Sequence, residues 1–247
     1  MAITLKHFSI KPGQRAALIG ASRSGKSTLG TFLVEDFRSS NKKPMILIVD
    51  TKPRFKAEWL VTGVSAKRHY KDQFYGEYIP GSVVVSNAAE LKLAWERGYE
   101  VAIIQLHKRN KETLTYVYDV IQWVFHFSNG KRNILVFVDE LMDLFHKNAT
   151  PIASASDGED SLVECVRLGG ERNLAVLIGA QRPKLFTIQM ITELTKCYLF
   201  RINFQTDLDR LREMSMEVYQ SPDKDHIFIY WEVENRKEIQ GPFTLSL

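Results

Sequence analysis

A chain of 247 residues, 45% of them hydrophobic, is long enough to bury a complete core, and we expect a single α/β domain over residues 1–247. The formal net charge of +4 is too small to attract a polyanion by itself, so such a contact would depend on local basic clusters. Two cysteines, Cys165 and Cys197, lie in apolar segments without metal-ligand spacing, which argues against a disulfide framework and a zinc site. No apolar run is long enough to span a bilayer and no signal-peptide pattern is present, so we expect a soluble, cytoplasmic protein.

Apolar runs alternate with helical patterns along the chain. Strands are expected at Ala16–Gly20, Met45–Asp50, Ser82–Ser86, Val101–Leu106, Asn133–Asp139, Ala175–Ala180 and Cys197–Asn203. Helices are expected at Lys26–Ser39, Ala88–Arg97, Glu112–Phe127, Asp160–Gly169 and Asp207–Met214. Continuous apolar runs are typical of strands covered on both faces. The alternation therefore predicts a mostly parallel central sheet with helices on both sides.

Two segments depart from this alternation. Residues 51–80 contain few aliphatic side chains and many basic and aromatic ones, which predicts an insertion at the carboxyl end of the second strand. In open α/β sheets that end is where ligands bind. Residues 226–244 form two short apolar runs around a polar turn, which predicts a C-terminal β-hairpin at the sheet edge or over the site.

The first expected strand leads into a phosphate-binding loop. The sequence GASRSGKST fits the pattern GxxxxGK[ST], and a helical pattern follows it. In such a loop, backbone N–H groups and the helix N-terminus hold phosphate oxygens, Lys26 reaches the β- and γ-phosphates, and the Ser27 hydroxyl ligates Mg²⁺. The predicted nucleotide-binding residues are Gly20, Ala21, Ser22, Arg23, Ser24, Gly25, Lys26, Ser27 and Thr28. A chance match is the alternative, and the strand and helix on either side disfavour it.

Two later strands end in polar residues suited to hydrolysis. The run from Asn133 ends in Asp139 and Glu140, where the aspartate would hold the Mg²⁺ shell and the glutamate would polarise the attacking water. The run from Ala175 ends in Gln181, which would contact the γ-phosphate or the water, or would only cap the strand. Together with the loop, these residues indicate nucleotide hydrolysis rather than binding alone.

The order and spacing of these motifs resemble the FtsK/HerA superfamily of DNA-pumping P-loop ATPases. The resemblance covers Arg15 to Asn203 and rests on Gly20–Thr28, Asp139-Glu140, Gly170–Asn173 and Gly179–Pro183, with Met45–Lys52 similar to the second strand of that family. Within the superfamily, the chain looks most like the compact genome-packaging ATPases of tailless, often membrane-containing viruses. Because the loop begins at Gly20, we expect little more than the motor domain, without an N-terminal barrel or membrane anchor.

The resemblance implies a RecA-like ATPase that uses ATP and Mg²⁺ and forms a ring, with six subunits expected, around double-stranded DNA. It further implies viral genome packaging, in the host cytoplasm or associated with the virion, with a capsid vertex, portal or membrane protein as partner. Such a motor needs a positive group from the neighbouring subunit. By position Arg172 matches the trans arginine of the family, with Arg167 and Arg201 as alternatives; each could instead be a solvated helix-end cation.

Three basic clusters are candidates for DNA contact, because loops of this kind can grip phosphates without reading sequence. Their basic residues are Lys52, Arg54 and Lys56; Lys67, Arg68 and Lys71; and Lys108, Arg109 and Lys111. Each cluster could instead be a solvated loop.

Two other functions remain open. An ATPase for phage assembly, secretion or conjugative DNA transfer would share the motifs, although such relatives usually carry a transmembrane segment. A nucleotide-dependent switch or kinase would share the loop, but the Asp139-Glu140 pair and Gln181 favour water as the acceptor over a second substrate.

Overall fold

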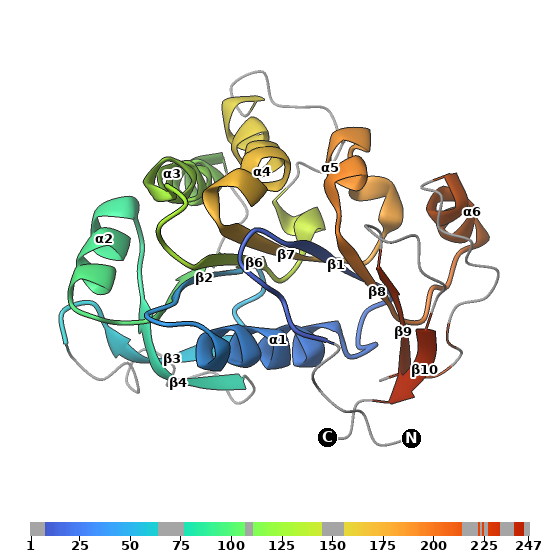
Figure 1. Cartoon of the computed structure of the whole chain (residues 1–247), viewed down its shortest axis with the longest axis horizontal. Helices are drawn as coiled ribbons and strands as arrows, with labels where there is room; N and C mark the ends of the chain where they lie inside the picture. The colour runs from blue at the N-terminus through green and yellow to red at the C-terminus, as the bar shows by residue number, and fades with distance from the viewer. Residues whose placement is uncertain are drawn as a thin grey trace.

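One central sheet organises the chain. The computed structural model describes residues 8–63, 77–106, 111–144, 156–213, 222, 224, 227–232 and 240–244. Within them a ten-stranded sheet runs in the order β10-β9-β8-β1-β7-β6-β2-β5-β4-β3 (Figure 1). The strands from β8 to β3 are parallel, whereas β9 runs antiparallel to both β8 and β10. The predicted mostly parallel α/β sheet with a C-terminal hairpin is confirmed; the turn of the hairpin lies outside the described residues.

Among the described residues every expected strand and helix is present, together with a strand at Phe55–Leu60 and a short helix at Ile188–Glu193 that were not expected. The strands are β1 (Arg15–Ile19), β2 (Met45–Asp50), β3 (Phe55–Leu60), β4 (Glu77–Val84), β5 (Val101–Gln105), β6 (Ile134–Val138), β7 (Leu174–Ala180), β8 (Lys196–Leu199), β9 (Ile227–Glu232) and β10 (Gln240–Thr244). The helices are α1 (Lys26–Ser40), α2 (Ala88–Glu96), α3 (Lys111–Phe127), α4 (Ser156–Leu168), α5 (Ile188–Glu193) and α6 (Gln205–Glu213). The described residues also contain the short 3-10 turns η3 (Leu141–Asp143), η4 (Gly170–Arg172) and η5 (Pro183–Leu185).

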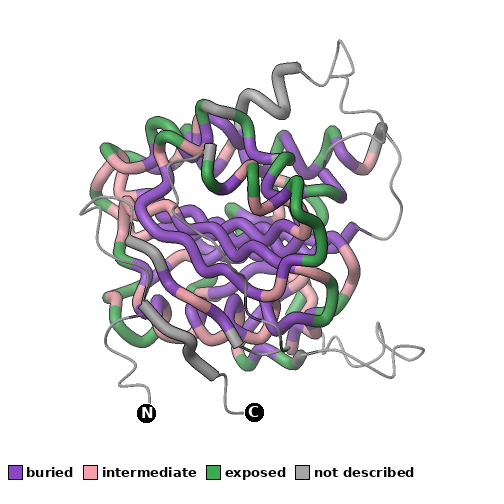
Figure 2. The backbone as a smooth tube through the Cα atoms, turned by 90° about the vertical axis from the view of Figure 1, so that its right-hand side faces the viewer, coloured by how far each residue is buried: buried purple, intermediate pink, exposed green. Residues whose placement is uncertain are grey.

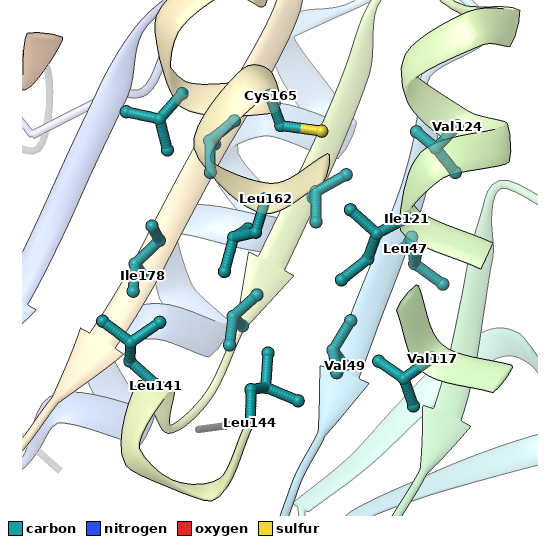
Figure 3. Close-up of a cluster of buried hydrophobic side chains, with 14 of the residues drawn as sticks. Leu47, Val49, Val117, Ile121, Val124, Leu141, Leu144, Leu162, Cys165 and Ile178 are labelled. Carbon is teal, nitrogen blue, oxygen red and sulfur yellow. The ribbon is translucent and has the colours of Figure 1, made fainter. Parts of the chain in front are cut away.

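The sheet separates two hydrophobic cores. On one face, α2, α3, α4 and α5 pack on the strands, and Figure 3 shows side chains of α3 and α4 meeting those of β2, β7 and the turn after β6. On the other face, α1 packs with aromatic residues from the N-terminal segment, β3 and the hairpin. Successive residues of β1 alternate between the two cores, as the period of a strand requires. Figure 2 shows the result: buried strands lie between helices whose outer faces are exposed.

The described part of the expected insertion extends the sheet. Residues 51–63 carry β3, which pairs in parallel with β4 and forms the sheet edge. Phe55 and Ala57 are buried while Lys56 and Glu58 between them are only partly covered, an alternation typical of a strand with one polar face. Strand β4 begins at Glu77, five residues before the expected Ser82. Residues 64–76 of the segment lie outside the description.

The described helices include none long and apolar enough to cross a membrane.

Candidate nucleotide-hydrolysis site

The strand order brings the predicted motifs together at the carboxyl-terminal ends of the central parallel strands. Strands β1, β7, β6 and β2 are parallel neighbours, so their carboxyl ends lie side by side. A cavity of about 260 Å³ opens at this edge. It is lined by Ser22, Arg23, Ser24, Gly25, Lys26, Ser27, Thr28, Arg54, Asp139, Glu140 and Gln181. The loop after β1, the carboxylates after β6 and the glutamine after β7 therefore share one site, together with an arginine that came from a different prediction.

Backbone hydrogen bonds fix the start of the phosphate-binding loop. The Gly20 N–H donates to the Ala180 carbonyl at 3.1 Å, and the Ala21 N–H donates to the Arg201 carbonyl at 2.7 Å. A Cβ on Gly20 would lie 2.6 Å from the Cβ of Phe200, so only glycine fits there. Gly25 precedes α1 in the left-handed region, with φ 103°. The first turn of α1 therefore points its free N–H groups into the cavity, where they can bind phosphate.

Lys26 lies inside this cradle with only 7% of its surface exposed. Its Nζ donates to the Gly20 carbonyl at 2.7 Å and to the Ala21 carbonyl at 2.8 Å. Burial lowers the pKa of Lys26 to about 8, and the nearby carboxylates of Glu140 and Asp139 only partly oppose this. The ammonium is thus held where a triphosphate would complete its hydrogen bonds.

The lowered pKa of Lys26 predicts that nucleotide affinity depends on pH in the alkaline range. A triphosphate favours the ammonium form, so the Kd should stay constant below the pKa of about 8 and increase above it. The expected increase is up to about tenfold per pH unit, the limit for one coupled proton. Titration of ATPγS at fixed Mg²⁺ from neutral to alkaline pH measures it, and Lys26→Arg should lose the dependence because arginine does not titrate there. A flat wild-type profile would contradict the prediction.

Ser27 and Asp139 form the pair that suits a magnesium ion. The Ser27 hydroxyl donates to Asp139 Oδ1 at 2.7 Å. Asp139 Oδ2 is buried and accepts no hydrogen bond from the described residues. Mg²⁺ prefers oxygen ligands and is usually bound by one or two carboxylates together with substrate phosphates. Among the described residues there is no group of three or more acidic, histidine or cysteine side chains that could hold a metal ion by itself.

Glu140 lines the cavity and is buried, with 3% of its surface exposed. Its Oε1 accepts from the Gln181 N–H at 3.1 Å and from the Met142 N–H at 3.4 Å. Burial raises the pKa of Glu140, while Lys52, Lys26 and Gln181 support the charged form. A carboxylate with a raised pKa is a better proton acceptor at neutral pH, which suits a general base. The predicted contact of the Gln181 side chain with phosphate or water stays a prediction.

Lys52 was predicted as a DNA contact, but it lies against the carboxylates of the site. Its Nζ is 3.9 Å from Glu140 Oε2 and 3.6 Å from Asp143 Oδ2. Thr51 Oγ1 also donates to Asp143 Oδ2 at 3.0 Å. Sequence reasoning missed Thr51 and Asp143; the signal that could have found Lys52 was its position just after β2, the strand beside β6. A role of Lys52 in DNA contact would have to compete with these pairings.

Asp50 closes the turn that carries Lys52 and Arg54 into the site. Its Oδ2 accepts from the N–H groups of Arg54 at 2.7 Å and Phe55 at 2.8 Å. The Gln105 side chain, at the end of β5, donates to the same oxygen at 3.3 Å. Burial raises the pKa of Asp50 to about 6, against the lowering effect of these donors. The hydrogen bonds to Asp50 fix this turn, which explains why Lys52 and Arg54 lie beside the carboxylates of the site.

Two other basic residues that were predicted to contact DNA belong to elements of which no described residue lines the cavity. Lys56 lies in β3, and Lys111 is the first residue of α3. The remaining predicted contacts lie outside the described residues: Lys67, Arg68, Lys71, Lys108 and Arg109. Their contact with DNA stays a prediction.

Arg172 lies just before β7, at the amino-terminal ends of the parallel strands and so on the side of the sheet opposite to the cavity. Its Nη1 donates to the Ser128 carbonyl at 3.1 Å and the Phe125 carbonyl at 3.4 Å, and its guanidinium lies 4.4 Å from the Phe125 ring. It therefore caps the C-terminal end of α3. Arg167 is exposed in the last turn of α4, while Arg201 follows β8 and holds Ala21 through its carbonyl. Which arginine acts on a neighbouring subunit stays a prediction.

Comparison with solved structures identifies the fold. The chain is similar to the genome packaging NTPase B204 of Sulfolobus turreted icosahedral virus 2 in complex with ATP-gammaS, with a TM-score of 0.62 and 12% identity over 95% of this chain and 100% of that one. The chain has the fold of this genome packaging NTPase. This confirms the resemblance that the motifs indicated. B204 structures have also been solved with AMP and AMPPCP.

Two other similar structures are longer chains, and this chain matches only a part of each. The pCW3 conjugation coupling protein TcpA matches with a TM-score of 0.50 and 16% identity, over 94% of this chain and 59% of that one. The cytoplasmic domain of the type VII secretion ATPase EccC from Thermomonospora curvata matches with a TM-score of 0.53 and 15% identity, over 93% of this chain and 25% of that one. No protein-family model matches the chain, and no curated protein sequence does either.

Proposed function

We propose that this protein is a Mg²⁺-dependent ATPase that drives the translocation of double-stranded DNA. The observation that carries the ATPase part is the meeting of Lys26, the Ser27–Asp139 pair and the buried Glu140 around one cavity. A switch that only binds nucleotide does not need a buried carboxylate behind the terminal phosphate, whereas hydrolysis needs a proton acceptor there.

Each residue of the site has a distinct role in this proposal. Ser27 and Asp139 hold Mg²⁺, which supplies charge neutralisation at the phosphates when bound. Lys26 and the N–H groups of the loop bind the phosphate oxygens and keep the terminal phosphate in place. Glu140 takes a proton from the attacking water, and the Gln181 N–H fixes its carboxylate.

The DNA-translocating part is supported by the fold likeness to a genome packaging NTPase over the full length of that chain. We infer a ring of identical subunits with duplex DNA in its channel, serving viral genome packaging. The likeness to TcpA, described as a conjugation coupling protein, favours conjugative DNA transfer as a second candidate. Both candidates require DNA to be the moved substrate, so the same experiment tests them against a secretion ATPase or a kinase.

Duplex DNA is expected to stimulate ATP hydrolysis, and the stimulation should fall steeply with salt. Each protein contact to a DNA phosphate releases counterions. The logarithm of the affinity for DNA therefore falls linearly with the logarithm of the salt concentration, with a slope close to the number of phosphate contacts. The measurement is phosphate release with and without blunt duplex DNA over a series of salt concentrations. Hydrolysis that DNA leaves unchanged at every salt concentration would end the translocase proposal while leaving the ATPase intact. Transfer of phosphate to a small molecule would instead identify a kinase.

A further inference from the structure

Arg54 lies among the catalytic groups rather than in an open loop. Its Nη1 donates to the Ser27 hydroxyl at 2.9 Å and lies 3.8 Å from Asp139 Oδ2. These two oxygens are the ones that suit a magnesium ion. The side chain of Arg54 is 43% exposed and lines the nucleotide cavity. The guanidinium therefore occupies the position that a cation would take between Ser27 and Asp139.

The backbone keeps Arg54 at this position. Its N–H is bound to the buried Asp50 carboxylate at 2.7 Å, directly before β3 begins. The base of the side chain is thus fixed to the sheet, while its exposed end can turn about the side-chain bonds. A residue held in this way can move its guanidinium by a few ångströms without any change in the fold.

Charge balance indicates where the guanidinium goes when a nucleotide binds. The cationic side chains of Lys26, Lys52 and Arg54 lie near the carboxylates of Asp139, Glu140 and Asp143 in this site, where Arg23 also lines the cavity. A triphosphate adds negative charge to the site, which favours keeping positive groups close. A Mg²⁺ ion held by Ser27 and Asp139 would compete with the guanidinium for these side chains, so the guanidinium would have to leave them. The planar guanidinium matches a phosphate with two parallel hydrogen bonds, so the terminal phosphate is its nearest new partner.

We propose that Arg54 is a nucleotide-binding residue of this site: it pairs with Ser27 and Asp139 before nucleotide binds and moves onto the terminal phosphate when a nucleotide enters, with or without the metal. The inference rests on the nucleotide-binding part of the proposed function and is independent of DNA. It gives Arg54 two effects of opposite sign. The phosphate contact strengthens nucleotide binding, whereas the pairing with Asp139 opposes the metal.

The test compares the binding of ATPγS to full-length wild type and Arg54→Ala, once in EDTA and once with excess Mg²⁺. In EDTA the variant loses a charge-assisted phosphate contact, and its Kd should rise about tenfold. With Mg²⁺ the same loss is partly offset because the metal no longer displaces the guanidinium, so the increase in Kd should be clearly smaller. Arg54→Lys keeps the charge but not the two parallel donors and should lie in between. Lys92→Ala removes an exposed charge of the same sign from α2 and is the matched control.

The outcomes separate this inference from the proposed function. Equal losses in EDTA and in Mg²⁺, or no loss in EDTA, would overturn the role of Arg54 while wild-type binding of ATPγS kept the ATPase proposal intact. Weaker duplex DNA binding with unchanged ATPγS binding would make Arg54 a DNA contact instead. Wild type that bound no ATPγS in either condition would remove both proposals.

Discussion

Glu140→Gln is expected to lower kcat for ATP hydrolysis by about 10²–10⁴-fold, the usual contribution of a positioned general base. The amide has the same shape but cannot accept the proton of the attacking water. The carbonyl oxygen of the new side chain can still accept from the Gln181 N–H, so the loop after β6 should keep its conformation. The Kd for ATPγS should therefore change little, and the loss should appear in kcat. Steady-state phosphate release together with an equilibrium titration of ATPγS separates the two quantities.

Glu96→Gln provides the matched control, since it makes the same change at an exposed carboxylate of α2 that pairs only with Lys92 among the described residues. It should hydrolyse ATP at the wild-type rate. Retention of wild-type kcat by Glu140→Gln would assign the proton transfer to another group and would leave Glu140 with a structural role, as the partner of Lys52 and of the Gln181 and Met142 N–H groups. A variant that lost ATPγS binding as well would point to a structural role for the buried carboxylate.

The central strands could be predicted because each is a continuous apolar run that can be recognised in the sequence without knowledge of its partners. Strand β2 has the predicted bounds Met45–Asp50, β6 is one residue shorter than predicted at each end, and β7 begins one residue earlier than predicted. Each is a continuous apolar run buried on both faces, and such a run has few alternatives as a strand. The motifs at the strand ends followed directly, since a parallel sheet brings carboxyl ends to one edge.

Strand β3 was missed because it has only one buried face. Phe55 and Ala57 enter the core, but Lys56 and Glu58 alternate with them and make the segment look like a charged loop. The short helix α5 was missed for a related reason: six residues are too few for a helical period to show. In both cases the partner that stabilises the element, β4 or the packed core, is distant in sequence.

The positions of Lys52 and Arg54 could not be derived from charge alone. A basic cluster beside an aromatic residue is compatible with a DNA-contacting loop or a solvated one. What decides their position is the pairing of β2 with β6, which brings residues about ninety positions apart in sequence into contact. Arg172 shows the same limit. Its spacing before β7 matched a family pattern, but its guanidinium binds carbonyls at the end of α3, which adjacency in sequence does not reveal.

Lys26→Ala is expected to raise the Kd for ATPγS by about 100-fold or more, because the lost ammonium makes charge-assisted hydrogen bonds of about 1.5–3 kcal/mol each. The same change should not lower the melting temperature of the protein without nucleotide. Burial lowers the pKa of Lys26 to about 8, which means that the folded chain holds this charge against a desolvation cost. Alanine removes the cost together with the bonds to the Gly20 and Ala21 carbonyls.

Melting curves with and without ATPγS distinguish this prediction from simple unfolding. Wild type should melt at a higher temperature when ATPγS is present, since a ligand that binds only the folded state stabilises it by mass action. At an ATPγS concentration well below its raised Kd, Lys26→Ala should melt at nearly its nucleotide-free temperature. Lys92→Ala, which removes an exposed charge of α2, should behave as wild type. A full ligand-induced shift in Lys26→Ala would mean that the triphosphate binds outside the Gly20–Thr28 loop. In that case the meeting of Ser27, Asp139 and Glu140 at this edge would need a different explanation.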